Sequence, residues 1–156
     1  MTPYRALIER TAAAHGLDAD LVEAIVIAES NGYTDAFRHE PDFYRRYLAH
    51  NAEYAGLNPR RISSSYGLMQ VMFTTAQHYG FQDHPELLFV PEIGLSYGCL
   101  HLAQLLRWAT GEIRKAVAAY NGGQGNWHGE QPQRYATRVL KLSDAVRRTH
   151  AEAKAV

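Results

Sequence analysis

Apolar side chains recur at helical spacing along most of this chain, and this periodicity limits the possible folds more than any other feature. Leu21, Ile25 and Ala28 follow an i, i+4, i+7 pattern, and similar stripes start at Leu95 and at Tyr135. Strict alternation of apolar and polar residues over the length of a strand occurs nowhere. The sequence therefore predicts an all-α fold.

Capping and turn residues divide the chain into about seven helices. They are expected from Pro3 to Gly16, Asp18 to Asn31, Pro41 to Gly56, Tyr66 to Gly80, Pro91 to Gly111, Ile113 to Tyr120 and Gln133 to Val146. The glycines between Asn121 and Gly129 predict a loop. The weakly patterned stretch 33–61 is interpreted as an inserted segment that decorates the core.

A chain of 156 residues can bury a core without disulfides or metals. Repeats, low-complexity segments and linkers are not visible, so we expect residues 1–156 to form a single domain. Cys99 is the only cysteine, which excludes an internal disulfide. Its apolar neighbours predict a small buried thiol rather than a nucleophile.

The charge balance excludes several classes of partner. Lysines and arginines number 16, as do aspartates and glutamates, so no overall field attracts nucleic acid or an anionic membrane. Basic clusters are local, as at Arg134, Arg138 and Lys141, and are typical of solvated helix faces. No apolar run is long enough to insert into a membrane.

Common catalytic motifs are also missing. The sequence has no phosphate-binding loop and no dinucleotide fingerprint, because the glycines after residue 121 follow a predicted helix rather than a strand. The eight histidines form no His-Glu-x-x-His pair, so we expect no metal site. A Gly-x-Ser-x-Gly elbow is absent as well.

Glu29 lies at a position that would suit a catalytic acid, although its helix taken alone is more often compatible with an ordinary glutamate whose carboxylate faces solvent. At about 100° per residue it lies about 20° from Val22 and about 40° from Ile25, at the border of the apolar face. It also lies in the last turn of its predicted helix, where the helix dipole is negative. Burial and the dipole both favour a neutral carboxyl, so we expect a raised pKa, as a general acid for glycoside cleavage requires.

Four motifs follow one another along the chain. Glu29-Ser30 comes first, followed by Gly67-Leu68-Met69-Gln70, then by Ala119-Tyr120-Asn121-Gly122-Gly123 and finally by Tyr135-Ala136-Thr137-Arg138-Val139-Leu140. In this order they resemble the SLT-type lytic transglycosylase family, from about Leu21 to Leu140. The resemblance implies a lysozyme-like helical domain related to goose-type lysozyme.

The resemblance also implies roles for individual residues. Glu29 matches the catalytic acid and base of the family. Residues that match its substrate-binding positions are Ser30, Met69, Gln70, Tyr120, Asn121 and Tyr135. Taken by itself, Tyr120 is equally compatible with packing in the core, and for Tyr135 and Met69 packing in the core is the favoured interpretation. Amide side chains such as that of Asn121 suit the N-acetyl groups of amino sugars, because an amide both donates and accepts hydrogen bonds.

The sequence departs from the family pattern in two places. The separation between Glu29 and Gly67 is longer than is usual, and the extra residues include Asp35 and Glu40 as candidate second carboxylates. The residue after Asn121 is Gly122 rather than alanine, which we expect to loosen the loop.

Three functions are compatible with these residues. The resemblance implies a cofactor-independent lytic transglycosylase, which cleaves the bond between N-acetylmuramic acid and N-acetylglucosamine and leaves a 1,6-anhydro end. A hydrolytic muramidase would instead activate water with a second carboxylate such as Glu40 or Asp35. The third function is a non-catalytic peptidoglycan-binding module that keeps the fold.

The expected partner is the glycan strand of peptidoglycan, bound by a monomer. The site of action would then be the periplasm or the cell wall. Met1 to Arg10 show no apolar segment typical of a signal peptide. We therefore expect either a bacteriolytic phage protein, such as an endolysin, or a domain trimmed from an exported protein.

Overall fold

The structure is a computed structural model that describes residues 2–156. Most of this range is helical, which confirms the all-α prediction, although a short sheet is added. The chain forms two compact units, one made of the segment up to Gly32 with Cys99–Val156, the other of Tyr33–Gly98. None of the helices in the described range has the length and apolar character to cross a bilayer.

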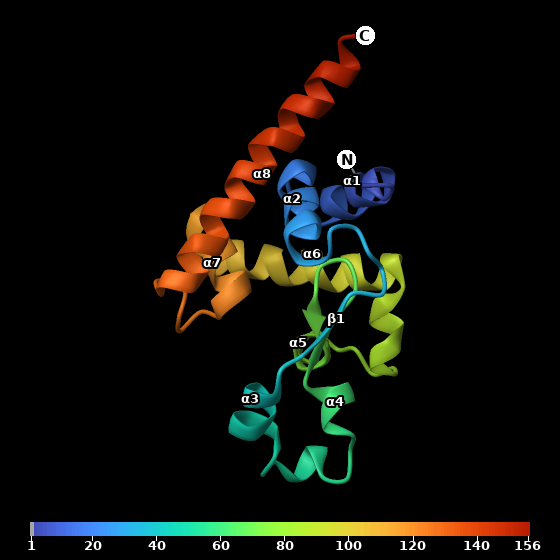
Figure 1. Ribbon diagram of the computed structural model, residues 1–156, viewed down its shortest axis with the longest axis vertical. Coiled ribbons are helices and arrows are strands. Elements are labelled where there is room, and N and C mark those ends of the chain that lie inside the picture. The colour runs from blue at the N-terminus through green and yellow to red at the C-terminus, as the bar shows by residue number, and fades with distance from the viewer. Residues whose placement is uncertain (1) are drawn as a thin grey trace. The chain divides into compact units, whose positions relative to one another are not determined.

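The first unit is a helical bundle (Figure 1). It contains α1 (Arg5–Ala14), α2 (Ala19–Ser30), the second half of α6 (Pro91–Trp108), α7 (Ile113–Gly122) and α8 (Glu130–Lys154). The long helix α8 packs against both α2 and α7, and α1 packs against α2. Fully buried side chains from these helices, such as Ile25, Val117 and Val139, form the core.

Local sequence fixes both ends of α2. The Asp18 carboxylate accepts a hydrogen bond from the Asp20 N–H at 2.8 Å, which satisfies an unpaired donor at the helix start. Asn31 ends the helix in the left-handed conformation, with φ of 51°, as asparagine often does. Both ends agree with the sequence prediction, and they leave Glu29 in the last turn of α2.

Glu23 is a fully buried acid that ties three helices together. Its carboxylate accepts hydrogen bonds from the Thr2 N–H at 2.7 Å and from the Arg5 guanidinium at 2.8 Å, and pairs with His150 Nε2 at 2.9 Å. Burial alone would raise the pKa of Glu23, but these three partners outweigh it and lower that pKa. The network therefore holds α1, α2 and α8 in one arrangement.

Replacing Glu23 by glutamine is expected to lower the free energy of unfolding by about 3 kcal/mol at neutral pH, because the partly buried Arg5 guanidinium loses its counter-charge. A lowered carboxyl pKa contributes stability above about pH 4.5, which is lost as the pH falls through the folded-state pKa. The difference between Glu23→Gln and the parent protein should therefore shrink in acid. Urea unfolding across pH measures this, with Glu9→Gln, an exposed partner of Arg5, as the control. A pH-independent difference would contradict the account.

The second unit combines short helices with a three-stranded antiparallel sheet. The sheet order is β1 (Phe37–His39), β2 (Ser64–Tyr66), β3 (Val71–Met72), with Phe37 opposite Tyr66 and Ser65 opposite Met72. The helical elements are α3 (Pro41–Phe43), a π-helical turn (Tyr44–Leu48), a 3-10 turn (Ala52–Tyr54), α4 (Pro59–Ile62), α5 (Phe73–His78), a second 3-10 turn (Pro85–Phe89) and the start of α6.

Two of the helices predicted in this unit were wrong in extent, and in the first unit α8 runs further than expected, from Glu130 to Lys154. The helix expected from Tyr66 to Gly80 is instead the end of β2, a turn, β3 and α5, because Gly67 and Gln70 adopt positive φ values of 73° and 48° that reverse the chain. The helix expected from Pro41 to Gly56 breaks into short turns. The loop expected from Asn121 begins two residues later, since α7 continues through Gly122.

Gly67 is required at the turn between β2 and β3. A Cβ atom at this position would lie 2.6 Å from the Leu88 carbonyl oxygen, which belongs to the backbone and cannot rotate away. The Gly67 N–H donates to the Ala36 oxygen at 2.8 Å, which fixes the turn against the start of the sheet. Gly56 has a similar φ of 76° but no atom within 4 Å of the corresponding Cβ position.

This pair of glycines separates the cost of a backbone conformation from the cost of a clash. Gly56→Ala should destabilise the fold by about 1 kcal/mol, since only the left-handed conformation is penalised. Gly67→Ala should cost about 2 kcal/mol more, because the added methyl group displaces a backbone carbonyl. Urea unfolding measures both losses, and equal losses would show that the close approach to Leu88 is unimportant.

Candidate active site

The central contact of the site joins α2 to α8. The Tyr135 hydroxyl donates a hydrogen bond to Glu29 Oε1 at 2.7 Å, across 106 positions of sequence. Glu29 is partly buried in the last turn of α2, and Tyr135 lies near the start of α8. The two residues that the sequence assigned to the acid and its neighbouring tyrosine are therefore in direct contact.

Two tyrosine hydroxyls near Glu29 are kept protonated. Burial, followed by the negative charge of Glu29, raises the pKa of Tyr135 far above its ordinary value. The same two causes, in the same order, raise the pKa of Tyr120 well above its ordinary value. Each hydroxyl thus remains a neutral donor beside the carboxyl group and adds no charge to it.

Tyr120 and Asn121 occupy the last turn of α7. The Tyr120 ring lies 5.4 Å from the His101 ring, centroid to centroid, which ties it to α6. Asn121 is partly buried, and over residues 2–156 its side-chain amide makes no hydrogen bond with protein. An amide that the protein leaves unused at a half-buried position can bind a polar ligand.

The glycine after Asn121 has a packing role rather than the loosening effect predicted from sequence. Gly122 is the last residue of α7, and a Cβ atom there would lie 2.3 Å from Pro132 Cγ of α8. Gly123, with φ of 81°, is the residue that ends the helix. The absent side chain at Gly122 therefore allows α7 and the start of α8 to approach closely.

Ser30 is buried and shapes the end of α2. Its hydroxyl donates to the Val26 oxygen at 3.0 Å and accepts from the Gly32 N–H at 3.2 Å. These bonds fix the turn immediately after Glu29, and so they help to set the direction of its side chain.

Met69 and Gln70 belong to the second unit. Met69 is fully buried, and its sulfur would lie 2.4 Å from a Cβ atom added at Gly98, so it packs tightly against α6. Gln70 Nε2 donates to the oxygens of Ala36 and Gly67, at 2.9 and 3.1 Å. The left-handed backbone of Gln70 is thus held in place by its own side chain.

The two candidate second carboxylates are also in the second unit. Glu40 pairs with Arg38 at 2.7 Å, and its backbone exchanges hydrogen bonds with Ser63. Asp35 is exposed in the turn before β1. Within the described range, no three histidine, cysteine or acidic side chains gather as metal ligands would.

Sequence reasoning did not assign two side chains that lie close to the site. Arg138 lies about one helical turn after Tyr135. Its positive charge lowers the pKa of Tyr135, in opposition to burial and the charge of Glu29, which raise it. His101 supports the Tyr120 ring. Arg138 stood within the last motif and a basic cluster, which could have indicated it, whereas His101 had no signal beyond helical spacing. Cys99 is buried as predicted, and burial raises the pKa of its thiol to about 12.

Comparisons with known proteins agree with the fold described above. The model of the transglycosylase SLT domain family matches residues 6–141. The fold is similar to lytic transglycosylase Slt from Pseudomonas aeruginosa, solved as an inactive glutamate-to-glutamine variant, with a TM-score of 0.71 at 21% identity over 96% of this chain. It is also similar to the 70 kDa soluble lytic transglycosylase Slt70 from Escherichia coli, with a TM-score of 0.73 at 18% identity over 94% of this chain.

This chain therefore belongs to the transglycosylase SLT domain family, and its lysozyme-like helical fold is confirmed. It spans 24% of the length of each of the two lytic transglycosylases. No curated protein matches the sequence.

The raised pKa of Tyr135 can be measured against the other nine tyrosines. Raising the pH to about 11 should give the same tyrosinate absorbance for folded parent protein and folded Tyr135→Phe, because Tyr135 stays protonated. In guanidinium, where the environment of Glu29 is lost, the variant should give one tyrosinate fewer. A deficit of one tyrosinate in the folded variant would contradict the burial of this hydroxyl beside Glu29.

Proposed function

We propose that this chain is a peptidoglycan lytic transglycosylase with Glu29 as its only catalytic acid and base. The observation that carries the proposal is the hydrogen bond from Tyr135 to Glu29 in a chain of the SLT domain family. The substrate is the glycan strand, and the cleaved bond joins N-acetylmuramic acid to N-acetylglucosamine. The raised pKa of Glu29 stays a prediction.

The reaction would use one carboxyl group twice. Because Tyr135 donates to Oε1, we assign the transferable proton to Oε2 of Glu29. That proton passes to the glycosidic oxygen while the bond from the muramic C1 to this oxygen breaks. The 6-hydroxyl of the same muramic acid then attacks C1, and Glu29 accepts its proton. The product is a 1,6-anhydro sugar, and no water is consumed.

The remaining motif residues divide into binding and positioning roles. Asn121 contacts an N-acetyl group through its amide. For Gln70 the group available to a polar ligand is its side-chain oxygen, because its nitrogen is occupied. Tyr120 lies beside Glu29 and contacts the sugar with its hydroxyl. Ser30 positions the turn after Glu29, and Met69 supports Gln70 from the core.

The proposal extends to the setting of the enzyme. Residues 1–156 act as one catalytic domain, as a monomer, in the periplasm or cell wall where peptidoglycan lies. Release by a phage and export from a bacterium are both compatible with the same chemistry. No cofactor takes part in the steps above.

Replacing Glu29 by glutamine tests the proposal, since an amide cannot donate and recover the proton. Purified sacculi are digested and the released fragments are weighed by mass spectrometry. The parent protein should release fragments with 1,6-anhydro ends, and Glu29→Gln should be slower by at least about a hundredfold. Binding to sacculi should persist in the variant.

Glu40→Gln and Asp35→Asn are the matched carboxylate controls, and both should keep the product profile of the parent protein. If the parent protein instead produces reducing ends, and either control variant no longer produces them, the protein is a hydrolytic muramidase with a second carboxylate. Equal fragment release by Glu29→Gln and the parent protein would remove Glu29 from the site. If the parent protein binds sacculi but releases no fragments, the protein is a non-catalytic peptidoglycan-binding module.

A further inference from the structure

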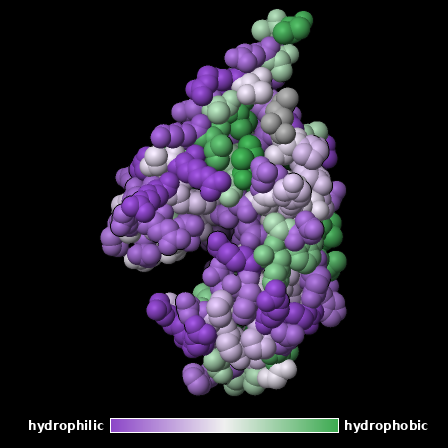
Figure 2. Space-filling view, in the orientation of Figure 1, coloured by the Kyte–Doolittle hydropathy of each residue, from purple (hydrophilic) through white to green (hydrophobic). Residues whose placement is uncertain are grey.

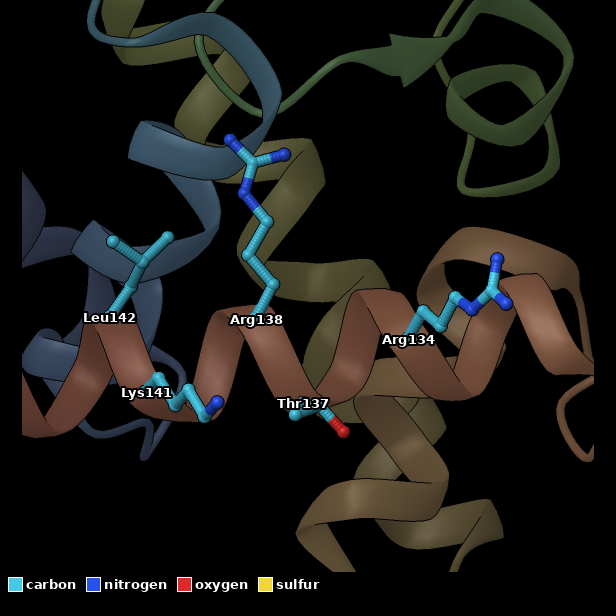
Figure 3. Close-up of a pocket in the computed structure, with 5 residues that line it drawn as sticks. All are labelled: Arg134, Thr137, Arg138, Lys141 and Leu142. Atoms are coloured by element: carbon cyan, nitrogen blue, oxygen red, sulfur yellow. The ribbon is translucent and has the colours of Figure 1, made fainter.

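A basic pocket lies along α8, beside Tyr135 but outside the residues assigned to cleavage. It has a volume of about 410 Å³ and is lined by Arg134, Thr137, Arg138, Lys141 and Leu142 (Figure 3). All five side chains project from this one helix, and Arg138 extends away from its axis. In the space-filling view, hydrophilic residues dominate the surface over the start of α8 and the preceding loop (Figure 2).

Only some of the positive charges of this pocket are balanced by an acidic partner. Arg134 pairs with Glu130, and further along the helix Arg147 pairs with Asp18 and Asp144. Over residues 2–156, neither Arg138 nor Lys141 forms an ion pair. Two like charges three positions apart on a helix repel each other. In a chain of zero formal net charge, this pair produces a local positive field that an anionic ligand would neutralise.

The walls of the pocket are held in place by the neighbouring helix. Arg114 of α7 donates to the Thr137 hydroxyl at 3.0 Å and reaches the Gln133 side-chain oxygen at 3.4 Å. Arg114 thereby adds a further positive charge beside the pocket. Leu142 and Thr137, both partly buried, supply apolar and hydroxyl surface next to the cations. Such a mixture suits a short chain that carries both methyl groups and carboxylates.

The position of the pocket relates it to the cleavage site. Arg138 lies about 4.5 Å along the helix from Tyr135, and Lys141 about 9 Å, at 1.5 Å per residue. In peptidoglycan the muramic acid at the cleaved bond carries a peptide stem with carboxylates. An extended peptide spans about 3.5 Å per residue, so two or three stem residues cover this distance. A sugar held at Glu29 would therefore place its stem within reach of both cations.

We propose that Arg138 and Lys141 bind a carboxylate of the peptide stem and so select glycan strands that carry charged stems. This inference rests on the proposed function, because the stem is placed by the sugar bound at Glu29. A limited pocket in which two cations have no ion-pair partner among the described residues fits a stem better than a long phosphate polymer, which would need a continuous basic track.

The test compares glycan strands of equal length whose stems carry either free carboxylates or amides of the same shape. The parent protein should show a kcat/KM about tenfold higher for the carboxylate form. In the double variant Arg138→Gln/Lys141→Gln, this ratio should fall to about one, because charge-assisted hydrogen bonds are lost. Arg148→Gln, an exposed arginine of α8 outside the pocket, should keep the ratio of the parent protein.

Three results would overturn the proposal. The first is an unchanged ratio in the double variant. The second is an equal loss on both substrates, which would mean that the cations act on Tyr135 and Glu29 instead. The third is inhibition of the parent protein by a phosphodiester wall polymer, if the double variant is no longer inhibited but keeps the parent ratio of kcat/KM for the two strands.

The failure of the proposed function is recognised separately. It would appear as no 1,6-anhydro product from either substrate with the parent protein. Calorimetric binding of the same two strands by Glu29→Gln still measures the carboxylate preference in that case. A preference of about tenfold that is lost on adding the two glutamine substitutions supports the stem site, and equal binding of both strands overturns it.

Discussion

The hydrogen bond between Tyr135 and Glu29 is the contact on which the site depends, because it joins the end of α2 to the start of α8 at the carboxyl group itself. The rest of the first unit holds these two helices in the required arrangement. At the other end of the pair, Glu23 of α2 contacts His150 of α8. Two polar contacts, each between residues far apart in sequence, thus fix one helix against the other.

The two glutamates of α2 show how different surroundings give identical side chains different roles. Glu23 has no exposed surface and is surrounded by cationic and backbone donors, so its charge is balanced and its role is structural. Glu29 instead meets tyrosine hydroxyls that carry no charge, and we propose that its carboxyl group is therefore free to give up and recover a proton. The two glutamates are six residues apart, which is about 1.7 helical turns, and they therefore meet different side chains of α8.

Sequence patterns predicted the parts of this fold that depend on local interactions. The ends of α2 followed from Asp18 and Asn31, whose capping contacts involve neighbours in the chain. The strands were missed because each has two or three residues, too few for an alternating pattern. The partners of Glu23 could not be predicted, since His150 is 127 positions away. Glu29 and Tyr135 were paired only through their motifs, and the packing role of Gly122 required the position of Pro132.

In the function proposed above, Glu29 is the only catalytic carboxyl group, and the substrate's own hydroxyl takes the place of water. The most direct measurement is digestion of sacculi in water enriched in oxygen-18, followed by mass spectrometry of the newly formed ends. If the 6-hydroxyl of muramic acid attacks C1, the new ends are anhydro-muramic ends that contain no label. Labelled reducing ends, formed at the rate of chain cleavage, would contradict this attack.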